Sequence, residues 1–266
     1  MEPNKLYELF KLFKSSLQQR TEYLTEDSLR YYFFACMYKR DNNLDHYIME
    51  LPYASLEGED NKQYKIFITE DDAKSLLTKD KAKINHHNPH QELDLYYYNG
   101  KNELICIEFK FHRNPQNTTQ AYPNNAGRIM NDIRRLKLIK PKKDLSIRRL
   151  FVYVTDDDMH EYFTSISGQK KYRGYRKDLQ SFYKGDTNKT VFEEFVMNDG
   201  KYELNNGNKE YRCPKTFFNS ANDSFSEHAE TIEIETNKVF DSTFNTKCNS
   251  FQGDNHTCHI LIYEVI

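Results

Sequence analysis

Residues 92–112 read ELDLYYYNGKNELICIEFKFH, and this stretch decides the fold. Two apolar and aromatic runs, 93–98 and 103–111, flank Asn99-Gly100, which is the strongest short-range signal of a β-hairpin. The second run is interrupted near its end by Glu108 and Lys110. Because alternate side chains of a strand share a face, we expect these two charges to point the same way and Phe109 to enter the core.

The register of this hairpin decides whether Asp94, in the first run, meets the two charges of the second. A two-residue turn at Asn99-Gly100 would turn Asp94 away from Glu108. A three-residue loop with Gly100 in the left-handed conformation shifts the pairing by one and places Asp94, Glu108 and Lys110 on one face. Buried, adjacent carboxylates repel and lose hydration, so a bound divalent cation is the most economical account of such a cluster.

Hydrophobic periodicity outlines the other elements. It predicts helices at 4–19, 26–38 with Thr25 as N-cap, 70–77 with Thr69 as N-cap, and 126–139. It predicts strands at 45–56, where Pro52 restricts the strand to an edge or a strand end, at 65–68, at 148–155 before a turn of three Asp residues (156–158), and at 258–265. Residues 190–217 suggest short strands or a hairpin at 205–207. We expect an α/β protein with a mixed sheet flanked by helices.

Composition is that of a folded, soluble protein. The chain has 266 residues, of which 38% are hydrophobic and 29% charged, with no run long enough to cross a membrane and no signal-peptide core at its start. Its five scattered cysteines indicate reduced thiols, and we therefore expect a cytoplasmic location. The net charge is only -2, but residues 101–150 hold twelve Lys and Arg against four Asp and Glu, a local charge of +8.

The hairpin and its neighbours resemble the PD-(D/E)xK nuclease superfamily, the restriction-endonuclease-like group. The likeness rests on Glu92-Leu93-Asp94 in one strand, Glu108-Phe109-Lys110 in the next, Glu26 in a preceding helix, and a following helix and strand. The Pro of the family's name is missing before Asp94. The resemblance implies an αβββαβ core at about 20–155 completed by the strand at 257–266, with 156–255 as an elaboration of one domain spanning 1–266.

The family resemblance also implies a magnesium site. Asp94, Glu108 and the carbonyl of Phe109 would hold Mg²⁺, for which Mn²⁺ can substitute, while Lys110 would act on the attacking water. Glu26 would tune the site, and Glu50 and Glu92 are additional candidates. Without the resemblance, Glu108 and Lys110 could be an ordinary cross-strand pair and Glu26 a residue that suits the helix dipole.

Basic residues around the motif are candidates for nucleic-acid binding, although each could instead be a solvated surface charge. They are Arg113, Arg128, Arg134, Arg135, Lys170, Lys171 and Arg173, with Tyr172 and Tyr175 as stacking partners for unpaired bases. The histidines 86, 87, 90 and 112 could suggest a transition-metal site, but a solvated loop is the better interpretation because no helix aligns them.

The resulting hypothesis is a Mg²⁺-dependent nuclease that hydrolyses phosphodiester bonds of nucleic acid, with DNA as the expected substrate and restriction or anti-phage defence as one role implied by the resemblance. A repair-type exonuclease is the alternative within the class. A catalytically inactive nuclease-fold protein that binds nucleic acid, or an ordinary α+β structural protein, are alternatives outside it. Double-strand cutting with one site per chain would favour a two-fold dimer.

Overall fold

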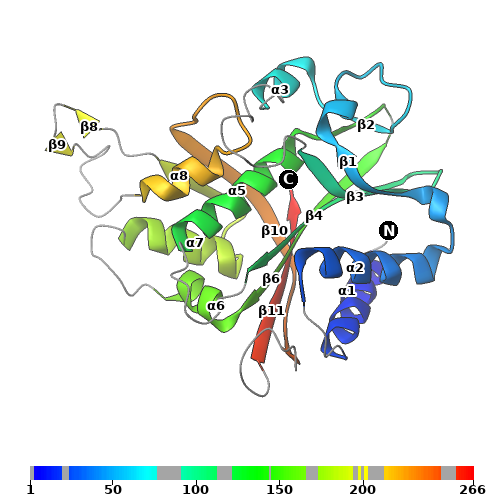
Figure 1. Cartoon of the computed structure of the whole chain (residues 1–266), viewed down its shortest axis with the longest axis horizontal. Coiled ribbons are helices and arrows are strands. Elements are labelled where there is room, and N and C mark those ends of the chain that lie inside the picture. The colour runs from blue at the N-terminus through cyan, green and yellow to red at the C-terminus, as the bar shows by residue number, and fades with distance from the viewer. Residues whose placement is uncertain are drawn as a thin grey trace.

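A seven-stranded mixed sheet runs through the molecule in the order β1-β3-β4-β6-β11-β10-β7 (Figure 1). The computed structural model describes residues 3–19, 24–76, 91–112, 122–143, 145–165, 173–193, 197–198, 201–202, 213–246 and 256–266. The strands of the main sheet are β1 Tyr47–Pro52, β3 Glu92–Tyr98, β4 Glu103–His112, β6 Ser146–Asp156, β7 Lys189–Glu193, β10 Thr231–Thr246 and β11 His256–Val265. The pair β4–β6 is parallel and the other neighbours are antiparallel.

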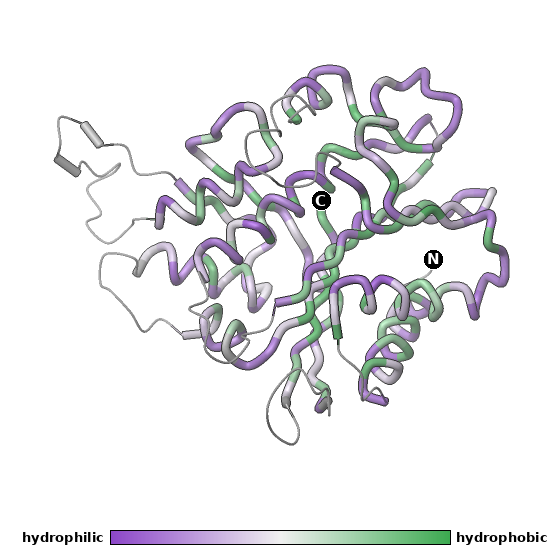
Figure 2. Tube along the Cα trace, viewed as in Figure 1, coloured by the Kyte–Doolittle hydropathy of each residue, from purple (hydrophilic) through white to green (hydrophobic). Residues whose placement is uncertain are grey.

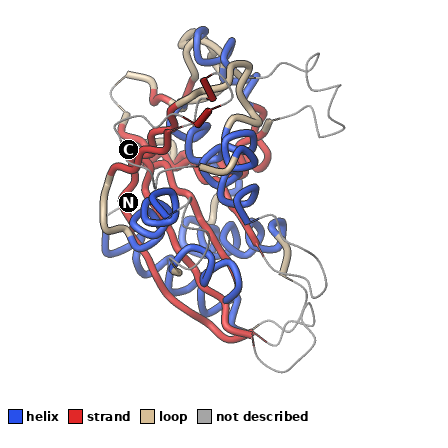
Figure 3. The backbone as a smooth tube through the Cα atoms, turned by 90° about the vertical axis from the view of Figure 1, so that its left-hand side faces the viewer, coloured by secondary structure: helices blue, strands red, loops and turns tan. Residues whose placement is uncertain are grey.

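Helices cover both faces of this sheet (Figure 3). The helices α1 Pro3–Gln18 and α2 Glu26–Asp41 pack on one face, and α5 Tyr122–Leu138, α6 Asp157–Thr164, α7 Arg173–Lys184 and α8 Lys215–Ala221 on the other. The remaining elements are α3 Glu70–Ser75, the 3-10 helices η1 Leu44–His46 and η2 Tyr53–Leu56, and the two-stranded pairs β2 Ile66–Phe67 with β5 Lys140–Pro141 and β8 Met197–Asn198 with β9 Lys201–Tyr202.

Alternation along the central strands creates one apolar core on each side of the sheet. In β6, Phe151 and Tyr153 belong to the core beneath α5, whereas Val152 and Val154 belong to the core beneath α1 and α2. Figure 2 shows the hydrophobic residues concentrated along these strands. This two-sided burial explains why the strand is a nearly continuous apolar run, as is usual for strands in the middle of an α/β sheet.

The predicted hairpin is present, but its loop contains more residues than predicted. Gly100 is left-handed, with φ of 75°, and the side chain of Asn99 accepts hydrogen bonds from three backbone amides of the loop, including that of Glu103 at 3.0 Å. The register pairs Tyr98 with Leu104. The predicted and the observed registers differ by two residues. Both of them therefore align Asp94 with an even-numbered residue of β4.

Most predicted elements are confirmed, one prediction is wrong, and one strand was missed. Thr25 and Thr69 are N-caps as expected, and the strand at 258–265 is β11, which lies between β6 and β10. The three Asp residues at 156–158 do not form a turn: Asp156, the last residue of β6, caps α6, which starts at Asp157, and its carboxylate accepts a hydrogen bond from the amide of Met159. The long strand β10 was not predicted. The hairpin proposed at 205–207 lies outside the described residues.

The structure also bears on membrane-spanning helices and on the state of the cysteines. No helix in the described ranges is long and apolar enough to cross a membrane. Cys36, Cys106, Cys213 and Cys258 are reduced and buried in the fold, as the sequence predicts.

Candidate active site

The candidate site begins where β3 and β4 separate, at Asp94. Its neighbours Leu93 and Leu95 belong to the cores on opposite sides of the sheet, so the chain twists at Asp94, and the pairing of the two strands ends at Leu95 with Ile107. The buried carboxylate accepts a hydrogen bond at Oδ2 from the backbone amide of Phe109, 2.6 Å away. Asp94 therefore lies in the gap between the strands and not on the single face that the hairpin register predicts.

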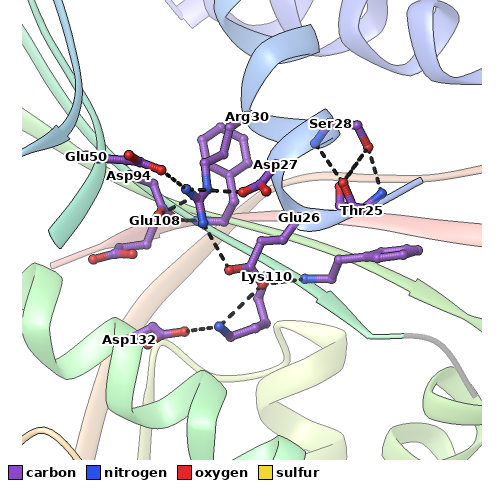
Figure 4. Close-up of polar contacts among 12 residues, drawn as sticks. Thr25, Glu26, Asp27, Ser28, Arg30, Glu50, Asp94, Glu108, Lys110 and Asp132 are labelled. Atoms are coloured by element: carbon purple, nitrogen blue, oxygen red, sulfur yellow. Dashed lines mark hydrogen bonds and ion pairs between the residues drawn. The ribbon is translucent and has the colours of Figure 1, made fainter. Parts of the chain in front are cut away.

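A guanidinium group from α2 joins Asp94 to three further acids (Figure 4). The Nε atom of Arg30 lies 3.2 Å from Oδ1 of Asp94, and its terminal nitrogens lie 3.0 Å from Glu50 and 3.4 Å from both Glu26 and Asp27. Arg30 is largely buried, with 15% of its side chain exposed. Four carboxylates from α2, β1 and β3 thus converge on one cation.

The start of α2 is held in place by a capping box. The Oγ of Thr25 accepts a bond from the amide of Ser28, and the Ser28 hydroxyl in turn accepts one from the amide of Thr25. This cap places Glu26 in the first helical turn, where its Oε2 lies 3.4 Å from both Nζ of Lys110 and the backbone amide of Phe111. The structure therefore brings Glu26 to the motif, as predicted.

The other half of the site is a chain of buried charges between β4 and α5. Oε1 of Glu108 accepts a hydrogen bond from the Tyr53 hydroxyl at 3.0 Å and lies 3.3 Å from Nη2 of Arg135. The same Nη2 lies 2.8 Å from Oδ1 of Asp132, whose Oδ2 lies 3.1 Å from Nζ of Lys110. Both charged side chains of the Glu-Phe-Lys motif are therefore linked through one helix.

Burial and neighbouring charges set the ionisation of these groups. Burial raises the pKa of Asp94 to about 6 against the opposing charge of Arg30, and raises the pKa of Glu108 well above its usual value despite Arg135. Burial also acts to raise the pKa of Asp132, but Lys110 and Arg135 outweigh it and hold that pKa below the usual value. For Lys110 itself, burial acts to lower the pKa, and the carboxylates of Asp132 and Glu26 reverse the effect and raise it.

Carboxylates outnumber cations in this cluster. Six acids meet three cations through the contacts above: Glu26, Asp27, Glu50, Asp94, Glu108 and Asp132 against Arg30, Lys110 and Arg135. No three His, Cys, Asp or Glu side chains in the described ranges converge tightly enough to enclose a metal ion by themselves.

The additional acidic candidates lie at different distances from the motif. Glu50 reaches Arg30, and its backbone has the left-handed φ of 54°, an unusual conformation for a residue with a side chain. Glu92 stands at the start of β3 opposite Pro52, half-buried, two residues before Asp94. The geometry thus connects Glu50 to the cluster, whereas no side-chain hydrogen bond or ion pair in the described part of the chain connects Glu92 to it.

The predicted basic surface of α5 is only partly present. Arg128 is exposed, but Arg134 stacks on Phe225 and donates to Asn222, and Arg135 pairs with Glu108 and has only 11% of its side chain exposed. These two arginines are therefore internal contacts of the fold, and their predicted surface position is wrong. Tyr175 is also fully buried, so its predicted role in base stacking is withdrawn. Arg113, Lys170, Lys171, Tyr172, the side chain of Arg173 and the histidines 86, 87 and 90 lie outside what the structure describes.

Four residues of the site escaped the sequence analysis as functional candidates or received a different role. Arg30, Asp132 and Tyr53 were not singled out, and Arg135 was assigned to the surface. Two of them carried a usable signal: Arg30 follows Glu26 by four residues and Arg135 follows Asp132 by three, the spacings at which helical side chains are neighbours. Tyr53 lies in a separate element and carried no such signal.

Comparisons with known proteins add no relative. No protein-family model matches this chain, and no curated protein and no solved structure matches it.

Proposed function

We propose that this chain is a Mg²⁺-dependent nuclease with Asp94, Glu108 and Lys110 at its catalytic centre. The observation that carries the proposal is the position of the buried Asp94 carboxylate, which accepts a hydrogen bond from the backbone amide of Phe109, the residue between Glu108 and Lys110. The charge of Asp94 acts to raise the pKa of both Glu108 and Lys110, so it acts on both motif side chains. Burial raises the pKa of both carboxyl groups even though Arg30 lies beside Asp94 and Arg135 beside Glu108, and a bound divalent cation would offset this cost of burying charge. Nucleic acid, with DNA as the first candidate, is the proposed substrate.

The donors fit a hard divalent cation. Asp94, Glu108 and the carbonyl of Phe109 would supply oxygen ligands, and Mg²⁺ needs few such protein groups because it keeps several waters. In the described part of the chain, the contacts of Glu108 reach Oε1, so Oε2 is the oxygen it can offer. When bound, the ion supplies charge that polarises the scissile phosphate and makes a coordinated water more acidic.

The chain's own residues would perform the remaining tasks. Lys110 is held as an ammonium between Asp132 and Glu26, so it is suited to orient the attacking water and to stabilise charge that develops on the phosphate. Glu26 keeps that amine on the side of the site nearest α2. The hydrogen bond from the amide of Phe109 fixes the Asp94 carboxylate in the gap between the strands.

A second candidate, a nucleic-acid-binding protein of this architecture without catalysis, is favoured by one observation. Arg30 already pairs with Asp94, and Arg135 already pairs with Glu108, so each proposed metal ligand has a partner inside the protein. Removing these positive charges from the carboxylates would be part of the cost of binding a metal ion.

The experiment that separates the two candidates is a cleavage assay with a matched lysine control. Supercoiled plasmid, linear duplex, single-stranded DNA and RNA are incubated with Mg²⁺, with Mn²⁺ or with EDTA. We expect metal-dependent cleavage that falls about 100-fold or more in Lys110→Ala. Lys137→Ala, which removes an exposed lysine paired with Glu235 on the surface, should leave the rate unchanged. Binding of nucleic acid without cleavage of any substrate would refute the nuclease and support the second candidate.

A further inference from the structure

A single buried carboxylate on α5, that of Asp132, contacts one charged residue of the motif, Lys110, and the partner of the other, Arg135. Its Oδ2 lies 3.1 Å from Nζ of Lys110, and its Oδ1 lies 2.8 Å from Nη2 of Arg135, which lies 3.3 Å from Glu108. Only 5% of Asp132 is exposed. A carboxylate this deeply buried is costly unless its charge is matched, and here it is matched by two cations at once.

The position of each cation follows from this arrangement. Lys110 ends a flexible four-carbon chain, and its amine lies between Asp132 and the more distant Glu26, at 3.4 Å. Arg135 is shared between Asp132 and Glu108, and its contact with Asp132 is the shorter one. Asp132 therefore draws the lysine toward α5 and also holds part of the guanidinium's charge away from Glu108.

We infer that Asp132 is a positioning residue of the proposed reaction. It sets the location of the Lys110 amine, and it limits how strongly Arg135 competes with a metal ion for Glu108. The inference rests on the proposed function and extends it to a residue of α5, outside the two strands of the motif. It predicts two separable defects when the charge is removed: a slower chemical step through Lys110 and a weaker response to metal through Arg135.

Asp132→Asn tests the inference because it removes the charge and keeps the shape. We expect kcat to fall about 10- to 100-fold with little change in KM for nucleic acid, and the Mg²⁺ concentration for half-maximal activity to rise by a similar factor. Adding Arg135→Gln to this variant should restore the metal response, because no guanidinium would then compete for Glu108, while kcat stays low. Asp71→Asn, which breaks an exposed pair with Lys74 on α3, is the matched control and should change neither quantity.

The reactivity of the Lys110 amine can be measured directly by chemical labelling. Acetylation of the folded protein with an amine-specific reagent, measured for each peptide by mass spectrometry, should proceed several-fold faster at Lys110 in Asp132→Asn than in the wild-type chain, with no change at Lys137. Circular dichroism and thermal melting verify that the variants are folded. The variant Asp132→Glu, which keeps the charge, should retain slow labelling and tests the inference again if Asp132→Asn unfolds.

The two levels of the proposal fail differently. A wild-type chain that cleaves with Mg²⁺, together with an Asp132→Asn chain that has the same kcat, metal response and labelling rate, would refute the inference and leave the proposed function intact. A wild-type chain that cleaves no substrate would refute the proposed function and this role of Asp132 together. A uniform loss of activity with unchanged labelling and unchanged metal response would assign Asp132 to fold stability alone.

Discussion

Replacing His112 by asparagine should remove a defined part of the protein's loss of stability in acid. His112 ends β4, two residues after Lys110, and is buried with Nδ1 hydrogen-bonded to the hydroxyl of Tyr153 at 3.2 Å. Burial, reinforced by the charge of Lys110, lowers the pKa of His112 to about 3. The ring is therefore neutral in the folded protein, whereas the unfolded chain binds a proton near pH 6.5.

The sign and size of the effect follow from this difference in pKa. The stability contributed by the neutral ring is fully present above about pH 6.5 and is lost as the pH falls from there toward the folded-state pKa, because only the unfolded chain takes up the proton. Between about pH 7.5 and pH 5 the loss amounts to about 2 kcal/mol in the free energy of unfolding. The amide side chain introduced by the substitution can keep a hydrogen bond near the position of Nδ1, and it does not titrate.

The assay is urea denaturation of the wild-type chain and of His112→Asn at both pH values. The variant is expected to be less stable at neutral pH, since a buried ring has been lost, but to lose about 2 kcal/mol less on acidification than the wild-type chain. Asp94 and Glu108, whose raised pKa values act in the opposite direction, titrate in both proteins and cancel in the comparison. Equal losses in the two proteins would show that His112 is not held neutral and would refute the reasoning.

Three further predictions concern the elements that hold the site. Thr25→Ala and Thr69→Ala each remove one N-cap, and each should lower the free energy of unfolding by about 1 kcal/mol. Only Thr25→Ala should also reduce cleavage, because it loosens the helical turn that carries Glu26. Glu50→Gly should be about 1 kcal/mol more stable than Glu50→Ala in the same denaturation assay, because the backbone there is left-handed; equal stability would contradict this. Gly127→Ala should lower the free energy of unfolding by about 1 to 3 kcal/mol, because the new methyl group would overlap the carbonyl oxygen of Phe217 and lie 2.8 Å from Cβ of Ser220. An unchanged melting temperature would contradict this close contact of α5 with α8.

The hairpin could be predicted because its information is local. Asn99-Gly100 and the alternation on either side specify two antiparallel strands without reference to the rest of the chain. The length of the loop was harder to predict, because it depends on the side chain of Asn99, which accepts hydrogen bonds from three backbone amides of the loop. The left-handed Gly100 was predicted correctly, and the pairing was off by an even number of residues, which keeps the face of every paired side chain but does not reach Asp94, because the pairing ends at Leu95.

Contacts between distant segments account for what the sequence did not reveal. Asp94 turns into the gap between two strands, and this twist depends on the packing of Leu93 and Leu95 into different cores. Arg135 is largely enclosed because Glu108 of β4 and Tyr53 of η2 both contact its guanidinium, and helical periodicity alone cannot indicate such partners. The strand β10 escaped prediction because polar residues interrupt its alternation and its register shifts between Lys238 and Phe240.

The place of β11 in the sheet has a consequence for how the protein folds during synthesis. This strand follows β6, β7 and β10 in the chain, yet it is the one that joins β6 to β10. Until the ribosome has released it, the half of the sheet that carries the acidic cluster and the half built from β7 and β10 can each form only with a long unpaired edge. Such edges invite pairing with other chains, so newly made molecules should be most prone to aggregate just before β11 emerges.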